Sequence, residues 1–282
     1  MTLAGVALAI LVAVSGEGAL AWGDRIAVIE IDGLIDDERR HLEQIRKFRE
    51  DPSVKGFLVS INSPGGVVGA SQSIYWELRR IREDGRPVIA TIGDIGASGG
   101  YYIALAADSI FALPGSITGS IGVVMEFPDV SELMRKVGVD MHVVKSAEHK
   151  DTGSPFRPLS PGDRAVVEEL VQDVYSQFVD VVAEERGLSA DEVRSLADGR
   201  ILSGRQAYAA GLVDRIGNRH DALAAAGRMA GLGDDPRVVR PPKREFTLLD
   251  LLLGRGATSG LTRWIGPLEG YSGPRLRFVV PF

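Results

Sequence analysis

Residues 86–102 read RPVIATIGDIGASGGYY, an apolar run followed by a serine set among glycines. The apolar run Pro87–Ile92 is short, which predicts a buried strand. Ser98 lies in a Gly-x-Ser-x-Gly pattern where a helix is expected to begin, at the place where a sharp strand-to-helix turn would expose a hydroxyl. Ser-Gly sequences are also ordinary turn chemistry. The stretch alone leaves both interpretations of Ser98 open.

The flanking sequence repeats this alternation of apolar strands and helices. Because helical segments of this length separate the strands, the connections are crossovers, and a mainly parallel, buried sheet of the α/β class is expected. Ser160 and Gly187 have the residue types that begin and end helices. Strands are predicted at 24–35, 54–61, 86–93, 109–115 and 141–146, and helices at 36–51, 71–84, 130–138 and 160–187, with further short helices after Ser189 and Ser203.

Composition excludes several classes of function. The net charge of −6 over 282 residues leaves no basic surface for nucleic acid. The chain has no cysteine, so a thiol nucleophile and a thiolate metal site are both excluded. Its four histidines show no His-x-x-x-His spacing, and the sequence therefore predicts no metal site.

The apolar N-terminal segment predicts an attachment to a membrane. Residues 1–14 carry no charge, but a spanning helix needs roughly 20 apolar residues. No Lys or Arg precedes the segment. We interpret residues 1–22 as a signal anchor without its basic flank, which predicts a single-pass protein whose main domain lies on the extracytoplasmic (periplasmic) side. A cleaved signal and a buried first helix are the alternatives. The main domain is expected at 23–232, followed by a tail at 233–282 without a usable motif.

A second motif lies where the strand 54–61 ends. The sequence INSPGG, residues 61–66, fixes one torsion at Pro64 and frees the next two peptides to turn their amides toward a ligand. Two such donors would hold an oxyanion, although the same residues also make ordinary turns. A serine nucleophile further needs a base. His142, His149 and His220 are candidates for a triad, and Lys145 and Lys150 are candidates for a lysine base.

Five motifs in fixed order connect these residues. They are INSPGG (61–66), GDIGASGGYY (93–102), GSITGSIGV (115–123), HKDTGSPFRPLSPGDR (149–164) and ADGRILSGRQAYAAGLVDRIG (197–217). In this combination, over roughly residues 25–230, the chain closely resembles the signal peptide peptidase A family of serine proteases. The resemblance implies the following roles: Ser98 as nucleophile, Lys150 as general base, Ser120 as the residue that orients the lysine, and the amides of Gly66 and Gly99 as the oxyanion hole. Sequence does not separate Gly65 from Gly66 as the donor, and Lys145 becomes a flanking residue.

The same resemblance implies a crotonase/Clp-type ββα superhelix with additional C-terminal helices, and no cofactor or metal. It further implies a ring-shaped homo-oligomer in which the Ser of one chain meets the Lys of the next. The implied substrates are remnant signal peptides and other short hydrophobic or unfolded segments. Three alternatives remain: a stomatin-partner-type membrane serine protease, a crotonase-fold acyl-CoA hydratase or isomerase using a Glu, and a membrane-tethered scaffold without catalysis.

Overall fold

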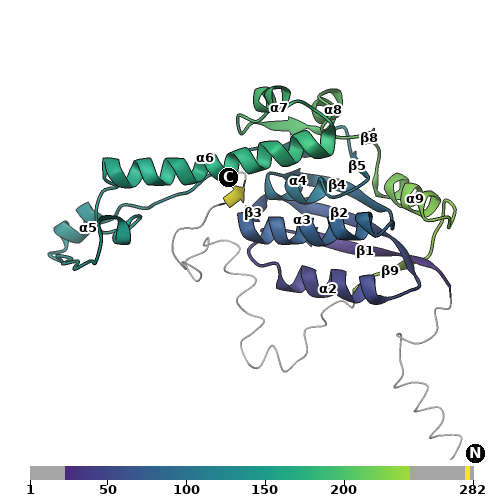
Figure 1. The fold of residues 1–282 in the computed structure, drawn as a ribbon, viewed down its shortest axis with the longest axis horizontal. Coiled ribbons are helices and arrows are strands. Elements are labelled where there is room, and N and C mark those ends of the chain that lie inside the picture. Colours follow the sequence, from purple (N-terminus) through teal and green to yellow (C-terminus); the bar gives the residue numbers. More distant parts are fainter. Residues whose placement is uncertain (1–22, 242–276, 280–282) are drawn as a thin grey trace, which may run out of the picture.

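A mainly parallel sheet forms the centre of the protein (Figure 1). The structure is a computed structural model that describes residues 23–241 and 277–279. The main sheet has eight strands in the order β7-β6-β4-β2-β1-β9, with β5 beside β4 and β8 beside β5, and within the described ranges only the β6–β7 pair is antiparallel. Its strands are β1 (Arg25–Asp32), β2 (Val54–Ser63), β4 (Val88–Ala97), β5 (Ser109–Ala112), β6 (Ile117–Gly119), β7 (Ile201–Ser203), β8 (Arg215–Ile216) and β9 (Val238–Val239).

Helices cover both faces of this sheet. Alternate residues of β1 point to opposite faces: Ile29 packs in the cluster that includes residues of α2, α3 and α4, whereas Ile26 and Val28 pack against Ala222 and Ala226 of α9. This burial on both faces explains the continuous apolar runs of the strands. The helices are α2 (Arg39–Glu50), α3 (Val68–Glu83), α4 (Gly99–Ala104), α5 (Ser131–Lys136), α6 (Pro161–Arg186), α7 (Ala190–Leu196), α8 (Gly204–Ala209) and α9 (Arg219–Met229), with a 3₁₀ turn η1 (Glu148–Asp151).

The carboxyl ends of β2 and β4 meet at one edge of the sheet. Both strands run parallel, and Ser63 pairs with Gly96 after a shift in register. The two glycine-containing motifs that follow these strands therefore come together, although they lie about thirty residues apart in the sequence. In open parallel sheets this edge is the usual location of a ligand site.

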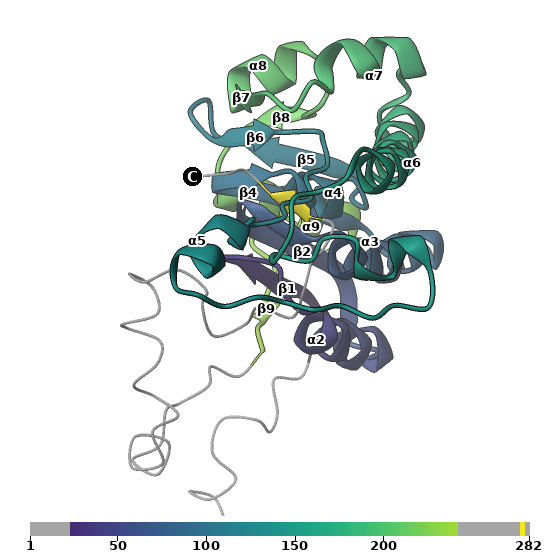
Figure 2. The same ribbon diagram turned by 90° about the vertical axis from the view of Figure 1, so that its left-hand side faces the viewer.

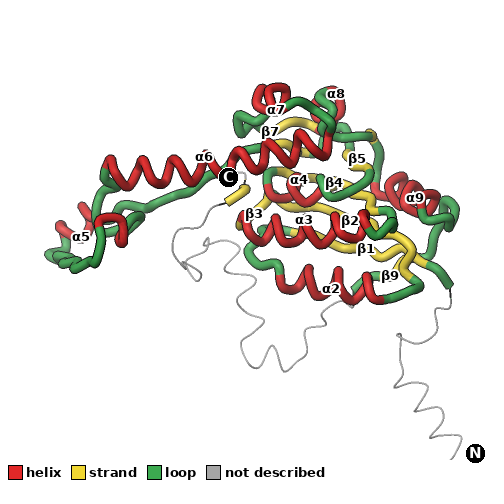
Figure 3. The backbone as a smooth tube through the Cα atoms, viewed as in Figure 1, coloured by secondary structure: helices red, strands yellow, loops and turns green. Residues whose placement is uncertain are grey.

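Helix α6 extends beyond the sheet and carries an arm (Figures 1 and 2). The second half of α6 is buried through Val174, Phe178 and Val182. It is also joined to α3, since Glu185 accepts a hydrogen bond from the Tyr75 hydroxyl at 2.6 Å. The first half is largely exposed and continues from residues 125–160, which are mostly loop around α5 (Figure 3). We call residues 125–172 the arm.

A second, two-stranded sheet lies apart from the main one. Strand β3 (Gly65–Val67) pairs antiparallel with β10 (Arg277–Val279), with Phe278 opposite Gly66. Strand β10 comes from the predicted tail, 233–282, and so does β9 at the edge of the main sheet. The predicted boundaries between 1–22, 23–232 and 233–282 stay predictions.

The α/β prediction with a mainly parallel sheet is confirmed, and so are the helix signals at Ser160, Gly187, Ser189 and Ser203. The Ser160 side chain accepts from the Asp163 amide, and Gly187 ends α6 in the left-handed conformation. Ser189 and Ser203 each form a complete capping box. The strand predicted at 141–146 is wrong. That segment lies in the arm without a neighbouring strand to pair with, and its apolar Val144 is fully exposed.

The prediction of a single-pass, membrane-anchored protein is wrong for the chain that the structure describes. Over residues 23–241 and 277–279, no helix combines the length and the apolarity that crossing a bilayer requires. Helix α6 is long enough, with 26 residues, but acidic and basic side chains occur along its whole length. The segment 1–22, on which the prediction rested, lies outside the described residues.

Candidate active site

Ser98 occupies a strained turn between β4 and α4. Its backbone torsions are φ 54 and ψ −116, and among the described residues only Ser98 and Ser120 are non-glycine residues with positive φ. The side chain is buried, and its Oγ has no hydrogen-bond partner within the described chain. Strain of this kind costs about 1–3 kcal/mol and persists where function requires the geometry. A buried hydroxyl without a partner is likewise unusual outside functional sites.

Glycine is required beside this serine because atoms of β2 and α3 lie close by. A Cβ added to Gly99 would lie 2.5 Å from the Ser71 Oγ, and one added to Gly100 would lie 2.8 Å from the carbonyl oxygen of Ser63. The Gly-x-Ser-x-Gly pattern therefore reflects close packing of α4 against β2 and α3 as well as the turn itself.

The backbone nitrogen of Gly66 lies close to Gly99. A Cβ on Gly99 would be 3.2 Å from the Gly66 nitrogen. The N–H of Gly65 is used differently, since it donates to the Ser63 Oγ at 3.1 Å. Of the two glycines that sequence could not separate, Gly66 is the one whose amide is not engaged by the Ser63 side chain.

Ser120 follows β6 and is joined to Ser98 through the backbone. The N–H of Ser98 donates to the Gly119 carbonyl at 2.8 Å, and the N–H of Ser120 donates to the Arg200 carbonyl at 2.8 Å. Ser120 lines a cavity of about 320 Å³ whose walls include Val171, Tyr175 and Ala197. The structure thus brings Ser98, Ser120, Gly66 and Gly99 together at one end of the sheet.

Lys150 is not part of this group within one chain. It lies in η1, in the arm, and is exposed. In the described chain, no hydrogen bond joins its amine to Ser98 or Ser120, and Figure 1 shows the arm extending away from α4. None of the candidate histidines takes the place of Lys150 as a partner of Ser98, because the Ser98 Oγ has no hydrogen-bond partner within the described chain.

A charged network organises the loop that carries Lys150. Asp163, with 2% of its side chain exposed, accepts hydrogen bonds from Thr152 Oγ1 at 2.6 Å and Ser160 Oγ at 2.8 Å, and pairs with Arg157 at 2.7 Å. His149 Nδ1 lies 3.0 Å from the same carboxylate. These hydrogen bonds, first that of Thr152, hold the pKa of Asp163 well below its usual range.

Lys145 is a member of this network. Its amine donates to Asp151 Oδ1 and to the Glu148 carbonyl, both at 2.7 Å. Hydrogen bonds from Arg157 and then Lys145 hold the pKa of Asp151 well below its usual range. The Lys145 amine is thereby held by its own loop, whereas no hydrogen bond or ion pair within the described chain holds the Lys150 amine.

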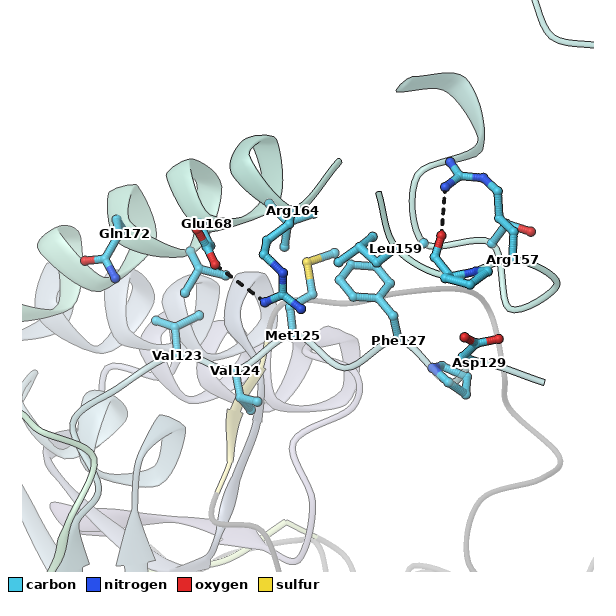
Figure 4. A pocket seen from close by; sticks show the side chains of 16 residues that line it. Val123, Val124, Met125, Phe127, Asp129, Arg157, Leu159, Arg164, Glu168 and Gln172 are labelled. Carbon is cyan, nitrogen blue, oxygen red and sulfur yellow. Dashed lines mark hydrogen bonds and ion pairs between the residues drawn. The ribbon is translucent and has the colours of Figure 1, made fainter. Parts of the chain in front are cut away.

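A groove lies along the base of the arm (Figure 4) and shares Val123, Val124, Val171 and Gln172 with the cavity that Ser120 lines. It has a volume of about 630 Å³ and lies between the segment Val123–Asp129 and the first half of α6. Met125, Phe127 and Leu159 give it apolar walls, while Arg164 and Glu168 form an ion pair of 3.5 Å beside them. Within the described ranges, no group of three or more His, Asp or Glu side chains is placed to hold a metal ion.

Comparison with known proteins identifies the family. The sequence profile described as Peptidase family S49 matches residues 80–233. A candidate protease of Synechocystis sp. is 42% identical over 212 residues, which cover 75% of this chain and 76% of that protein. The chain belongs to peptidase family S49. Its fold is accordingly of the crotonase/Clp type, as the sequence predicted, and the protein is a peptidase of the SppA type.

Two further S49-type relatives carry more specific names. A candidate signal peptide peptidase SppA of Enterococcus faecium is 38% identical over 216 residues, covering 72% of this chain and 63% of that protein. The chloroplastic serine protease SPPA of Arabidopsis thaliana is 32% identical over 257 residues, covering 86% of this chain but 38% of that protein.

Sequence reasoning missed two residues of this S49 site. Ser63 was part of a quoted motif but had no role, and only the structure shows that it engages the Gly65 amide. Asp163 stood in a quoted motif without a role, whereas it is the centre of the network around Lys150. The Ser-Pro-Gly-Asp sequence at the start of α6 predicts a helix cap. No sequence pattern predicts the hydrogen-bond and ion-pair partners of Asp163.

Proposed function

We propose that this S49 protein is a serine endopeptidase in which Ser98 is the nucleophile and Lys150 the general base. The observation that carries the proposal is the environment of the Ser98 hydroxyl. Its hydroxyl is buried and partnerless on a strained turn, next to the amides of Gly66 and Gly99. An unpaired hydroxyl at such a position is suited to attack a carbonyl whose oxygen the two amides receive.

The lysine is supplied by a neighbouring chain. Lys150 is exposed in the arm and lies outside hydrogen-bond reach of Ser98 in its own chain. The arm also carries exposed apolar side chains, which a partner would cover. They are Leu133, Val137, Val139, Met141, Val143, Val144, Phe156, Val166 and Leu170. A ring of identical chains, each with its arm laid on the next, would bring these surfaces and the two halves of the site together.

The cavity beside Ser120 is the space that we assign to the incoming lysine. Its apolar walls would desolvate the amine, which favours the neutral form that can accept a proton. A hydroxyl at Ser120 would orient that amine toward Ser98.

The reaction then proceeds by acyl transfer. The Ser98 Oγ attacks the peptide carbonyl carbon while its proton passes to Lys150. The amides of Gly66 and Gly99 stabilise the oxyanion, each by about 3 kcal/mol. The lysine returns the proton to the leaving amine, the peptide bond breaks, and a water activated by the same lysine hydrolyses the acyl-enzyme.

Short apolar or unfolded polypeptides, such as remnant signal peptides, are the substrates that suit this site. The 630 Å³ groove that adjoins the Ser120 cavity has apolar walls at Met125, Phe127 and Leu159 and charged side chains beside them. An extended chain would present its backbone to strand edges and its side chains to that groove. Membership of family S49 and the geometry around Ser98 both favour this reading over an acyl-CoA hydratase.

Single variants test the proposal. Hydrolysis of fluorescein-labelled casein should fall at least about 10³-fold in both Ser98→Ala and Lys150→Ala, because each removes a group that acts in the transition state. Lys136→Ala is the matched control for the lysine, since Lys136 is also exposed in the arm, and Ser73→Ala on α3 is the control for the serine. Full activity in either test variant would refute the Ser/Lys mechanism.

A further inference from the structure

The turn at residues 198–200 holds the backbone of Ser120 in place. The Arg200 carbonyl accepts the N–H of Ser120 at 2.8 Å. On its other side the turn is fixed to α6, because the Tyr175 hydroxyl donates to the Ala197 carbonyl at 2.9 Å. The turn therefore forms a well-anchored wall of the cavity that Ser120 lines.

Asp198 brings a charge to this cavity. Of the residues that line it in the described chain, Asp198 alone is charged. The others are Ser120, Gly122, Val123, Val124, Val171, Gln172, Tyr175, Ala197 and Gly199. A lysine amine that entered the cavity would therefore meet one carboxylate among neutral groups.

Arg200 neutralises this carboxylate. Its Nε lies 2.7 Å from Asp198 Oδ1 and 2.8 Å from Oδ2, and a second guanidinium nitrogen pairs with Oδ2. The backbone N–H of Arg200 also donates to Oδ1, at 3.1 Å. These hydrogen bonds, first those of the side chain, lower the pKa of Asp198 to about 2. The carboxylate is thus ionised at neutral pH, and a guanidinium two residues along the chain balances its charge.

This balance affects any amine in the cavity, because a general base must be neutral to accept a proton. An unpaired carboxylate beside an amine favours the protonated form, whereas an unpaired guanidinium favours the neutral form. Either charge alone would shift the pH at which the amine begins to act as a base. The effect grows when a neighbouring arm covers the cavity, since displaced water no longer screens the charges.

We propose that Arg200 is a positioning residue of this site, which holds the Asp198 carboxylate and so keeps the incoming lysine amine neutral at the working pH. The inference rests on the proposed function, since it needs a lysine base in the Ser120 cavity. It adds a residue pair that sets the pH range of the enzyme and that touches neither the substrate nor the Ser98 hydroxyl.

The other charged and titratable groups near the amine belong to the arm. They are Asp129, Arg157, Arg164 and Glu168 of the adjoining groove, and Lys145, Glu148, His149, Asp151 and Asp163 around Lys150. Most of them pair with one another, as in the ion pairs of Asp151 and Asp163 with Arg157. Substitutions at positions 198 and 200 leave these pairs intact, so a change in pH dependence reports on Asp198 and Arg200 themselves.

The alternative is an ordinary surface ion pair. In the single chain, 59% of the Arg200 side chain and 46% of the Asp198 side chain are exposed. Exposed pairs of this kind contribute little to stability. The two accounts are therefore separable, because a surface pair could be removed without any effect on the pH dependence of catalysis.

The test is the pH dependence of kcat/KM for fluorescein-labelled casein. Arg200→Gln, which keeps the backbone carbonyl that Ser120 uses, should move the midpoint of the rising limb up by about one pH unit. On that limb it should be about tenfold slower than wild type, and at the high-pH plateau the two should be equal. Asp198→Asn, which keeps an oxygen for the Arg200 N–H, should move the midpoint down.

Two further variants serve as controls. The double variant Asp198→Asn/Arg200→Gln carries neither charge, and its midpoint should return close to that of wild type. Arg194→Gln removes the arginine of an exposed pair with Asp191 on α7, outside the cavity, and should leave the midpoint unchanged. If Arg200→Gln does not assemble, the downward shift of Asp198→Asn and its cancellation in the double variant decide the question.

The failures of the two proposals are distinguishable. The inference is refuted if neither single substitution moves the midpoint, if both move it in the same direction, or if activity falls equally at every pH. In each of these cases the proposed function stands as long as Ser98→Ala and Lys150→Ala are inactive. If Lys150→Ala keeps full activity, the proposed function fails and the inference fails with it.

Discussion

The two regions that carry Ser98 and Lys150 are built in opposite ways. Ser98 follows a strand of the parallel sheet and is fixed by buried apolar packing, with Tyr101, Tyr102 and Ile103 of α4 almost fully buried. Lys150 lies in an arm whose apolar side chains are largely exposed and whose order comes from ion pairs around Asp151 and Asp163. The sheet region holds its shape by itself, whereas the arm is a surface that suits a partner.

The largest change in activity is expected when two inactive variants are mixed. This experiment tests whether Ser98 and Lys150 of one active site come from different chains. Ser98→Ala and Lys150→Ala chains, each inactive, should regain activity when unfolded together and co-assembled in equal amounts. In a closed ring about a quarter of the sites would combine an intact Ser98 with an intact Lys150. Casein hydrolysis measures the gain. No recovery in a mixture that does form the oligomer would mean that both groups must belong to the same chain.

A pair of substitutions compares how each region is stabilised. Ile29→Ala, in the buried core under α2 and α3, should lower the free energy of unfolding by about 2–5 kcal/mol. Val144→Asp, at a fully exposed position of the arm, should change it by less than about 0.5 kcal/mol but shift the oligomer toward single chains. Urea unfolding and sedimentation measure the two quantities. The comparison fails if Val144→Asp unfolds the protein as easily as Ile29→Ala does.

Asp163→Asn tests whether the network positions Lys150. Without the charge, Arg157 loses its buried partner and the loop that bears Lys150 loosens. A displacement of about 1 Å can cost about 100-fold in rate, so we expect kcat to fall about 10- to 100-fold while KM stays within about twofold. Glu169→Gln, at an exposed position of the same helix outside the groove, is the control and should be silent. Equal losses in both variants would argue for a general effect of charge on the arm.

Lowering the pH should weaken the same network around Asp151 and Asp163, with a smaller effect than the substitutions above. Because the folded-state pKa values of Asp151 and Asp163 lie below their unfolded values, folding favours the ionised carboxylates. Their stabilisation is complete above the unfolded pKa of about 3.9 and is lost as the pH falls toward the folded values. Amide hydrogen exchange of residues 148–163 should stay equally protected from pH 7 to about 4.5, after correction for intrinsic rates, and lose protection below. Loss of protection already near pH 6 would contradict this account.

Sequence predicted the sheet region better than the arm. Strands buried on both faces can be recognised in the sequence as continuous apolar runs. Helix ends can be recognised by capping residues such as Ser160 and Gly187. The segment 141–146 shows where prediction from sequence fails. Its apolar residues favoured a buried strand, but in the structure they are exposed in the arm. Sequence likewise identified Ser98, Ser120 and Lys150 as residues to examine, but their spatial relation depends on the direction of the arm. The positions of Asp163 and Phe278 depend on contacts over long sequence distances, which local patterns do not encode.

The backbone of Ser98 has a consequence for how related sequences diverge. A serine at φ 54 and ψ −116 opposes folding by about 1–3 kcal/mol, and glycine at the same position would avoid most of that opposition. Under the proposed mechanism, selection for peptide cleavage retains the side chain. In a duplicated gene whose product no longer cleaves peptides, drift toward glycine at this position would improve folding at no loss, so the residue found there separates working copies from copies kept for another purpose.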